Sequence, residues 1–521
     1  MVDEWMTGCA PFLDLKRREE QFNQKRSMFM TSFPLWMIMI LFSLALETVV
    51  AANAWHEHVS PKITINNLNE SDFQKFTAEA NYSNSFKLIE RDDDFLLVGS
   101  RNVVYNISLL SFEENKKLIW HSDQQDVRLC QLKGYPVDDC QNYVRVLAKT
   151  SNSSILVCGT NAFKPRCRSY MQKRSSYEIV KEISGEGFCS SNPHQNGTAI
   201  FARPPPRKES DLYTAIVRQY NSVIDELIYH EPMRTRQYDL QVLNHAEFVS
   251  SLHHEDHVFF FFRENAVEYT CGKRVFSRVA RVCTKDKGGP SIFRNSWTSF
   301  LKARLNCSVP GDYPFYFDEI QSTTGVVEGI YNGKIQKIIY GVFTTPQNSV
   351  GASAVCAFRM QDINDVFNGP FKEQINPNFN WKAVENSRVP DPRPGQCVND
   401  STHLPETNLR FIRSHPLMHL AVPFFWNGPV LIRTSMKFRF TKIAVDPQIE
   451  TMSGQYYDVL FIGTDDGRVI KAINSASNAK REQYNFNQVV PVIIEDISIF
   501  RQKTVINNLM VYRTHYDHKL I

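Results

Sequence analysis

The chain has 521 residues, of which 42% are hydrophobic and 22% are charged, as in an ordinary globular protein with a sizeable core. Its 59 basic and 55 acidic residues give a formal net charge of +4. This balance excludes a nucleic-acid binder that relies on overall charge, so local patches must carry any electrostatic recognition.

The N-terminal segment has the order of features of a secretion signal. A basic stretch, LKRREEQFNQKRS, precedes the apolar run Phe33–Leu46, and the small residues Ala52 and Ala54 follow. We expect a signal peptide over residues 1–54, with an extended basic region and cleavage after Ala54. An uncleaved membrane anchor is the alternative, because the run continues almost to spanning length, although Glu47 favours cleavage. No second such run follows, which predicts a released product.

Glycosylation acceptors and cysteines agree with export. The chain has 11 cysteines, and loss of Cys9 with the signal leaves an even number without the C-x-x-C spacing of a zinc site. Disulfides are therefore expected. The N-x-S/T acceptors, spread over almost the whole chain, are Asn69, Asn81, Asn106, Asn152, Asn196, Asn306 and Asn399.

A pattern of apolar strand, polar turn and apolar strand recurs along the chain. The spacing of the units, roughly 50 to 70 residues, is typical of four-stranded propeller blades with long loops. A pair of β-sandwiches is the alternative, but continuous runs such as VFFFF and ILVCGT favour buried inner strands. The matches are DDFLLVGSRNVVYNISL at Asp93, SSILVCGTNAFKPRCRSY at Ser153, DHVFFFFRENAVEYTCG at Asp256, KIIYGVFTTPQNSVGASAVCAFRM at Lys337 and YDVLFIGTDDGRVIKAINSAS at Tyr457, with fainter members at Asp211 and Phe438.

One region departs from this pattern. Between Lys285 and Asp318, the residues Trp297, Leu301 and Leu305 follow one another at helical spacing. We expect a helical insertion that projects from a blade.

The sequence gives only weak evidence for a catalytic or metal site. SLHHEDHVF contains His253, His254, Asp256 and His257, but consecutive strand residues point to opposite faces, and a polar loop explains them better. TDDG at Thr464 reads as a hairpin turn, because further calcium ligands at regular spacing are missing. We therefore expect no enzyme, no cofactor or metal and no small-molecule substrate.

Several segments together resemble the sema domain of semaphorins, from about Lys62 to the C-terminus. SVPGDYPFYF and FTKIAVD are most similar to invertebrate class 1 semaphorins. The other segments that carry the resemblance are DCQNYVRVLAK, CGTNAFKPRC, FFFFRENAVEY, SRVARVC, WTSFLKARLNCS, GVFTTPQNSVGASAVCAF, PRPGQC, SHPLM and YDVLFIGTDDG.

The resemblance implies an all-β fold, a seven-bladed β-propeller over residues 55–521. It also implies a helical extrusion in blade 5, placed at 285–356, and an N-terminal strand that helps to close the last blade. The sequence stops at THYDHKLI, about where the family continues with another strand pair and a plexin-semaphorin-integrin module. We therefore expect an incomplete last blade and no such module.

The resemblance also implies four disulfides: Cys130 to Cys140, Cys158 to Cys167, Cys283 to Cys397 and Cys307 to Cys356. Cys189 and Cys271 remain. They could pair with each other, stay as buried thiols or link two chains. We expect Cys271 to link two chains and Cys189 to be a structural thiol, and an internal bridge between them stays open.

The implied function is that of an extracellular guidance ligand, which binds plexin receptors through its propeller and clusters them as a homodimer. The expected receptor contacts are Arg234, Arg236 and Tyr238, with Arg413 as a further candidate. The alternative is a non-signalling soluble decoy, or an incomplete fragment of a semaphorin held at the cell surface. An extracellular hydrolase is a third reading, but it requires a convergent polar site that the sequence lacks.

Overall fold

The computed structural model describes residues 59–66, 68, 69, 72–78, 86, 88–92, 94–151, 153–174, 176–202, 211–220, 223–478, 489–500, 502–513 and 518–520. The expected signal peptide and the sequons Asn81 and Asn152 lie outside these residues. Pro61–Glu268 and Arg274–Ile521 form one compact unit, and Tyr269–Lys273 group with the residues up to Ser60 in another. The larger unit holds the sheets and the candidate site.

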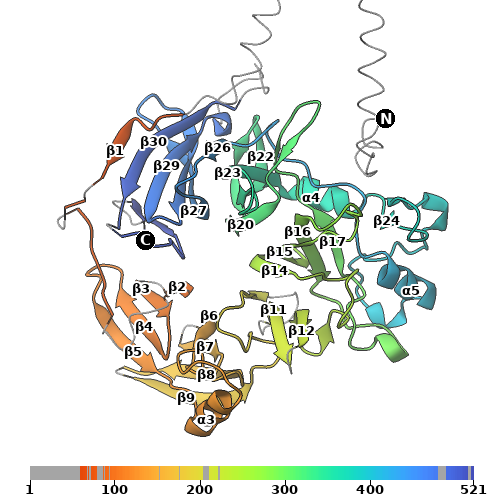
Figure 1. Ribbon diagram of the computed structural model, residues 1–521, viewed down its shortest axis with the longest axis horizontal. Coiled ribbons are helices and arrows are strands. Elements are labelled where there is room, and N and C mark those ends of the chain that lie inside the picture. Colours follow the sequence, from red (N-terminus) through yellow and green to blue (C-terminus); the bar gives the residue numbers. More distant parts are fainter. Residues whose placement is uncertain are drawn as a thin grey trace, which may run out of the picture. The chain divides into compact units, whose positions relative to one another are not determined.

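Six sheets of four or five strands follow one another along the larger unit (Figure 1). The first three are β2 (Leu88–Asp92), β3 (Phe95–Gly99), β4 (Val103–Ser108) and β5 (Glu114–Ile119); β6 (Val144–Ser151), β7 (Ser154–Gly159), β8 (Arg166–Gln172) and β9 (Tyr177–Ser184); and β10 (Thr198–Ala202), β11 (Asp211–Tyr220), β12 (Val223–His230) and β13 (Met233–Arg234). The next three are β14 (Glu247–His254), β15 (His257–Asn265), β16 (Val275–Cys283) and β17 (Leu301–Arg304); β20 (Glu319–Thr323), β21 (Val327–Tyr331), β22 (Lys334–Thr344), β23 (Ala352–Arg359) and β26 (Leu431–Thr434); and β27 (Phe440–Glu450), β28 (Tyr456–Thr464), β29 (Arg468–Asn474) and β30 (Pro491–Ser498), with β1 (Ile63–Ile65) added in parallel to β30.

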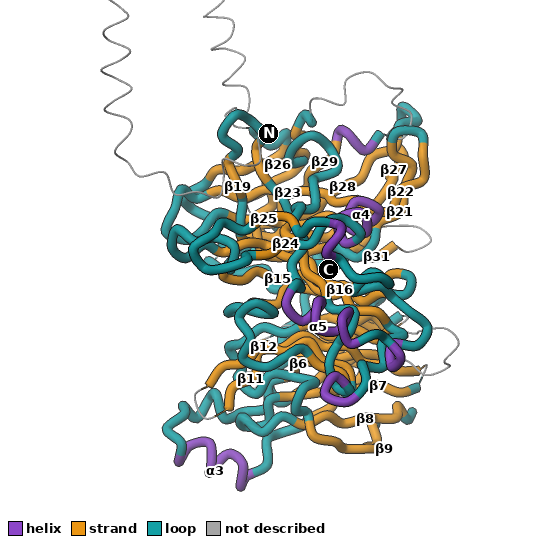
Figure 2. Tube along the Cα trace, turned by 90° about the vertical axis from the view of Figure 1, so that its right-hand side faces the viewer, coloured by secondary structure: helices purple, strands orange, loops and turns teal. Residues whose placement is uncertain are grey.

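The unit is an all-β propeller. The first strand of each sheet contacts the first strand of the next, from β2 through β6, β10, β14 and β20 to β27. Among the described residues the helices are short: α3 (Gln124–Leu132), α4 (Met360–Phe367) and α5 (Glu406–Ser414), with 3-10 turns at Ser291–Phe293, Asn386–Arg388, Ser401–His403 and Ser475–Ser477 (Figure 2). No helix in the described ranges is long and apolar enough to cross a membrane.

The repeated hairpins of the sequence form the middle strands of the sheets, which confirms that interpretation. These strands are apolar at consecutive positions because neighbouring sheets cover both of their faces. In β15, Phe259, Phe260, Phe261 and Phe262 are at most 1% exposed. One hairpin differs from the expectation, because the strand after β15 is β16 at Val275, whereas the residues AVEYTCG lie in the connecting loop.

The expected number of seven blades is wrong for the described residues, which form six large sheets. After β30, the strands β31 (Val511–Arg513) and β32 (His518–Leu520) pair with each other in a separate ladder. Residues 506–512, which reach into β31, contact both the last sheet and the first. Ile506 N donates to Thr464 O at 3.0 Å, and the Arg91 guanidinium lies 4.5 Å from the centre of the Tyr512 ring.

The expected helix with Trp297, Leu301 and Leu305 on one face is also wrong. Leu301 begins β17, and Trp297 packs in a different core cluster from Leu301 and Leu305. All three are buried because the segment is covered on both sides, and not because they share one face of a helix. The range 285–356 contains strands of two of the large sheets and the small β18–β19 ladder. The helices α4 and α5 instead lie between β23 and β26, with the short strands β24 (Lys372–Glu373) and β25 (Lys382–Ala383). A further ladder joins β18 (Ser308–Val309) to β19 (Phe315–Tyr316).

Candidate functional site

A cavity of about 260 Å³ lies between the third sheet, the loop before β17 and helix α5. It brings together Arg234, Arg236 and Arg413, which are far apart in the sequence. Tyr238 is 61% exposed and does not line the cavity. The remaining lining residues are Thr235, Val242, Ile292, Phe293, Ser296, Trp297, Phe300, Leu409, Ile412 and Pro416.

Backbone and side-chain hydrogen bonds fix the loop before β17 against the third sheet. Arg234 N donates to Asn295 O at 3.0 Å, and Trp297 Nε1 donates to Ile228 O in β12 at 3.0 Å. The indole is 7% exposed, so its N–H needs a partner in the interior. These bonds place the backbone of Arg234 beside the apolar residues of the loop.

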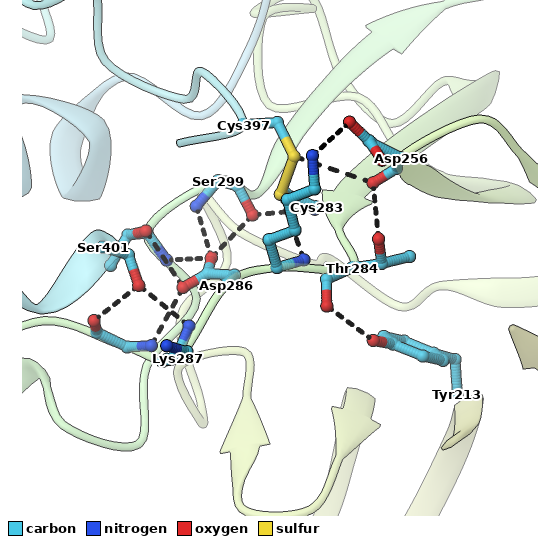
Figure 3. The surroundings of a disulfide bond; sticks show 12 residues. Tyr213, Asp256, Cys283, Thr284, Asp286, Lys287, Ser299, Cys397 and Ser401 are labelled. Carbon is cyan, nitrogen blue, oxygen red and sulfur yellow. Dashed lines mark hydrogen bonds and ion pairs between the residues drawn. A yellow bond between two sulfur atoms is a disulfide. The ribbon is translucent and has the colours of Figure 1, made fainter. Parts of the chain in front are cut away.

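Asp286 organises the same loop from the inside (Figure 3). Its buried carboxylate accepts hydrogen bonds from the backbone N–H groups of Gly288, Thr298 and Ser299 at 2.8 to 2.9 Å. The hydroxyls of Thr298 and Ser299 donate to it as well, at 3.0 and 2.6 Å. Five donors compensate for the cost of burying the charge, so the loop has one fixed conformation.

Gly288 has a φ of +79°, and a Cβ there would meet Arg294 O at 2.0 Å. Only glycine fits this turn of the loop.

A disulfide joins this loop to the segment that leads into α5. Cys283, at the end of β16, is bonded to Cys397, and Ser401 Oγ bridges the same two segments (Figure 3). Ser401 Oγ accepts from Lys287 N at 2.8 Å and donates to Gly288 O at 2.9 Å. The covalent bond and the two hydrogen bonds therefore hold two walls of the cavity together.

Helix α5 is amphipathic and supplies the third wall. Leu409 and Ile412 are 2% and 6% exposed and face the cavity floor, whereas Arg410 and Arg413 are exposed. Arg410 pairs with Glu406 one turn earlier, at 2.7 Å. Arg413 lies in the last turn, where the helix dipole favours a positive charge.

The rim of the cavity is cationic and only partly neutralised. Arg236 forms an ion pair with Asp239. Burial, together with the like charge of Arg413, lowers the pKa of Arg236. The ion pairs found among the described residues include neither Arg234 nor Arg413. A second cavity of about 360 Å³ shares Arg236, Ile292, Phe293 and Arg413 with the first and adds Arg410. Such a site suits an anion beside an apolar group.

The four disulfides that the resemblance implied are present in the structure. They join Cys130 to Cys140, Cys158 to Cys167, Cys283 to Cys397 and Cys307 to Cys356.

Cys189 is a free, buried thiol, and burial raises its pKa to about 12. Cys271 is disulfide-bonded, so a bridge between these two cysteines is wrong, and the partner of Cys271 is not among the described residues. Because its sulfur is already in a disulfide, Cys271 is not available in this structure for the expected link to a second chain.

The sequons differ in accessibility. Asn106 lies in β4, is 0% exposed and donates from Nδ2 to Tyr177 Oη at 3.0 Å, so a glycan there is incompatible with this fold. The expectation at Asn106 is therefore wrong. Asn69, Asn196 and Asn399 are exposed, and Asn306 is half-buried.

Sequence reasoning missed the apolar floor of the cavity and Arg410. The amphipathic pattern ETNLRFIRS was the available signal, since it places Leu409 and Ile412 on one face and Arg410 and Arg413 on another. No sequence pattern indicated that Ile292 lines the cavity, because its position depends on a loop that only tertiary contacts fix.

Known proteins are similar to this chain in fold and in sequence. A family model described as the Sema domain matches residues 320–513. Semaphorin-1A of Schistocerca americana is 51% identical over 482 residues, which cover 92% of this chain and 64% of the relative. The extracellular domains 1-2 of Drosophila Semaphorin 1a have a TM-score of 0.75 at 47% identity, with 82% of each chain covered. The chain belongs to the semaphorin family.

A further solved structure is Drosophila Plexin A in complex with Semaphorin 1b. It matches with a TM-score of 0.75 at 43% identity, over 85% of this semaphorin and 83% of that chain. The chain spans 52% to 64% of the length of the Semaphorin-1A relatives that it matches.

Proposed function

We propose that this semaphorin is an extracellular guidance ligand that binds a plexin receptor through the cavity formed by Arg234, Arg236 and Arg413. Plexin is proposed as the receptor because the chain is similar to a semaphorin solved in complex with Plexin A. The geometry supports the choice of surface. Arginines lie around an apolar floor, and both arginine and buried aromatic residues are enriched at the energetic centres of protein interfaces.

The second part of the proposal is that two ligand copies cluster two receptors. A homodimer presents two equivalent sites, so the apparent affinity for a membrane that carries several receptors exceeds that of a single site. The ligand works by binding and not by catalysis.

The test uses the secreted chain beginning at Trp55. Binding to an immobilised plexin A ectodomain is measured by interferometry, and the mass of the ligand is measured by light scattering. A dimer that binds is the expected result. A folded monomer that binds would identify a decoy instead, and a folded protein that does not bind would overturn the receptor assignment.

A further inference from the structure

The pocket rim contains more positive charge than its own chain neutralises. Asp239 and Glu406 pair with Arg236 and Arg410, and the ion pairs found in the described part of the chain leave out Arg234 and Arg413. Both side chains are exposed, so water solvates them while the pocket is empty. A partner that covered the pocket without supplying an anion would desolvate two unpaired guanidinium groups, which is costly.

The floor of the same pocket is apolar and preformed. Phe293, Trp297, Phe300 and Leu409 are between 2% and 7% exposed, and they are held by the loop and helix contacts described above. Ile292 is 74% exposed at the rim and adds apolar surface beside the floor. The cavity therefore offers dispersion contacts next to a charge.

We propose that the pocket takes an acidic peptide segment of the receptor, in which an Asp or Glu carboxylate binds Arg413 and Arg234 and a neighbouring apolar side chain covers the floor. This inference rests on the proposed function and deepens it. Arginine is suited to this role because its planar guanidinium donates two parallel hydrogen bonds to one carboxylate. A sulfated glycan would satisfy the arginines, but it has no apolar group for the floor formed by Phe293, Trp297 and Phe300.

The first experiment measures plexin A ectodomain binding by Arg413→Glu, Arg413→Lys and Arg234→Glu, with Arg128→Glu as a matched control. Arg128 is an exposed arginine of α3, outside the pocket. We expect Arg413→Glu and Arg234→Glu each to weaken binding about tenfold or more, Arg413→Lys to weaken it less, and the control to bind as the wild type. Circular dichroism and melting temperature establish that each variant is folded.

The second experiment tests the charge of the occupant directly. Acidic residues on the receptor surface are changed one at a time to lysine, and each receptor variant is tested against both wild-type ligand and Arg413→Glu. We expect one receptor variant that loses the wild-type ligand and recovers binding to Arg413→Glu. Ile292→Ser should weaken binding without changing its dependence on salt, because its contribution is apolar.

The outcomes separate the two proposals. If the folded wild-type chain does not bind plexin, the proposed function fails. If the wild type binds and the arginine variants bind equally well, the function stands and the acidic occupant is wrong. If the same variants lose binding to heparin but keep the receptor, the pocket is a glycan site. If they change the mass of the ligand dimer instead, a second copy occupies the pocket.

Discussion

Two groups of cationic side chains in this semaphorin lie under opposite conditions. Inside the fourth sheet, Arg278 and Lys302 are 0% exposed and are matched by Glu264 and Glu268. At the pocket rim, Arg234 and Arg413 are exposed and have no ion pair within the described ranges. The difference shows how one residue type serves two purposes: paired and buried cations fix the fold, whereas exposed and unmatched cations remain available to a partner.

The buried group is nearly saturated with hydrogen bonds. Arg278 donates to both carboxylate oxygens of Glu268 at 2.7 and 2.6 Å and to Glu264 Oε1 at 2.9 Å. Lys302 Nζ reaches the same Glu264 oxygen at 2.6 Å, and Asn244 N donates to the other oxygen at 3.1 Å. These contacts connect β15, β16 and β17 with the loop that follows β15.

The largest expected effect comes from removing one charge of the buried group. Glu264→Gln leaves Lys302 and part of Arg278 buried without an anion, so we expect unfolding free energy to fall by about 3 to 5 kcal/mol. Denaturant unfolding of the secreted chain measures this change. A loss below about 1 kcal/mol would show that the buried and exposed groups do not differ as described.

A smaller loss of stability is expected from breaking the bond in Figure 3. Cys283→Ser together with Cys397→Ser removes a covalent closure of 114 residues, and we expect a loss of about 2 to 4 kcal/mol. Receptor binding should also weaken, because the two walls of the pocket lose their link. Paired replacement of Cys130 and Cys140 by serine is the control, since Cys130 lies in α3 and neither cysteine lines the pocket. Equal binding by both double variants would show that the pocket does not depend on Cys283 and Cys397.

The acid stability of the chain should depend on Glu268. Burial opposes ionisation of this carboxyl, but the charge and hydrogen bonds of Arg278 outweigh burial and lower its pKa from 4.5 to about 2. The unfolded chain therefore binds a proton at a higher pH than the folded chain does. The stabilisation is present above pH 4.5 and is lost as the pH falls towards 2.

Glu268→Gln should be less stable than the wild type at pH 7 and should lose less stability between pH 4.5 and 2. Melting temperatures of both proteins, measured over this pH range, test this prediction. Parallel curves for the two proteins would contradict the pairing with Arg278.

The smallest effect on stability is expected at the pocket rim. Arg413→Gln removes an exposed charge without breaking an ion pair, so the unfolding free energy should change by less than about 0.5 kcal/mol. Binding to plexin should fall all the same. A large loss of stability in this variant would show that Arg413 stabilises the fold, as Arg278 and Lys302 do.

Glycan mapping by mass spectrometry adds a separate check of the fold. The secreted chain should carry no glycan at Asn106, whose side chain is buried in β4. Occupancy of Asn106 would contradict the structure of the first sheet, whereas glycans at Asn69, Asn196 and Asn399 are expected because these residues are exposed.

The sequence by itself determined the strands and their repetition. Apolar runs such as HVFFFFREN and FLLVG, each next to a polar turn, indicate buried hairpins because both the burial and the turn chemistry are local properties. The same local pattern misled at Trp297, Leu301 and Leu305, where burial from two sides imitates one helical face.

The tertiary structure alone decided the pocket and the number of sheets. Arg234 and Arg413 come together because Asp286, Ser401 and the Cys283–Cys397 bond fix two distant segments against the third sheet. No local periodicity encodes such long-range contacts. The partners of Glu264 and the burial of Asn106 likewise follow from strand packing, since a sequence shows the residue types but not which of them share an interior.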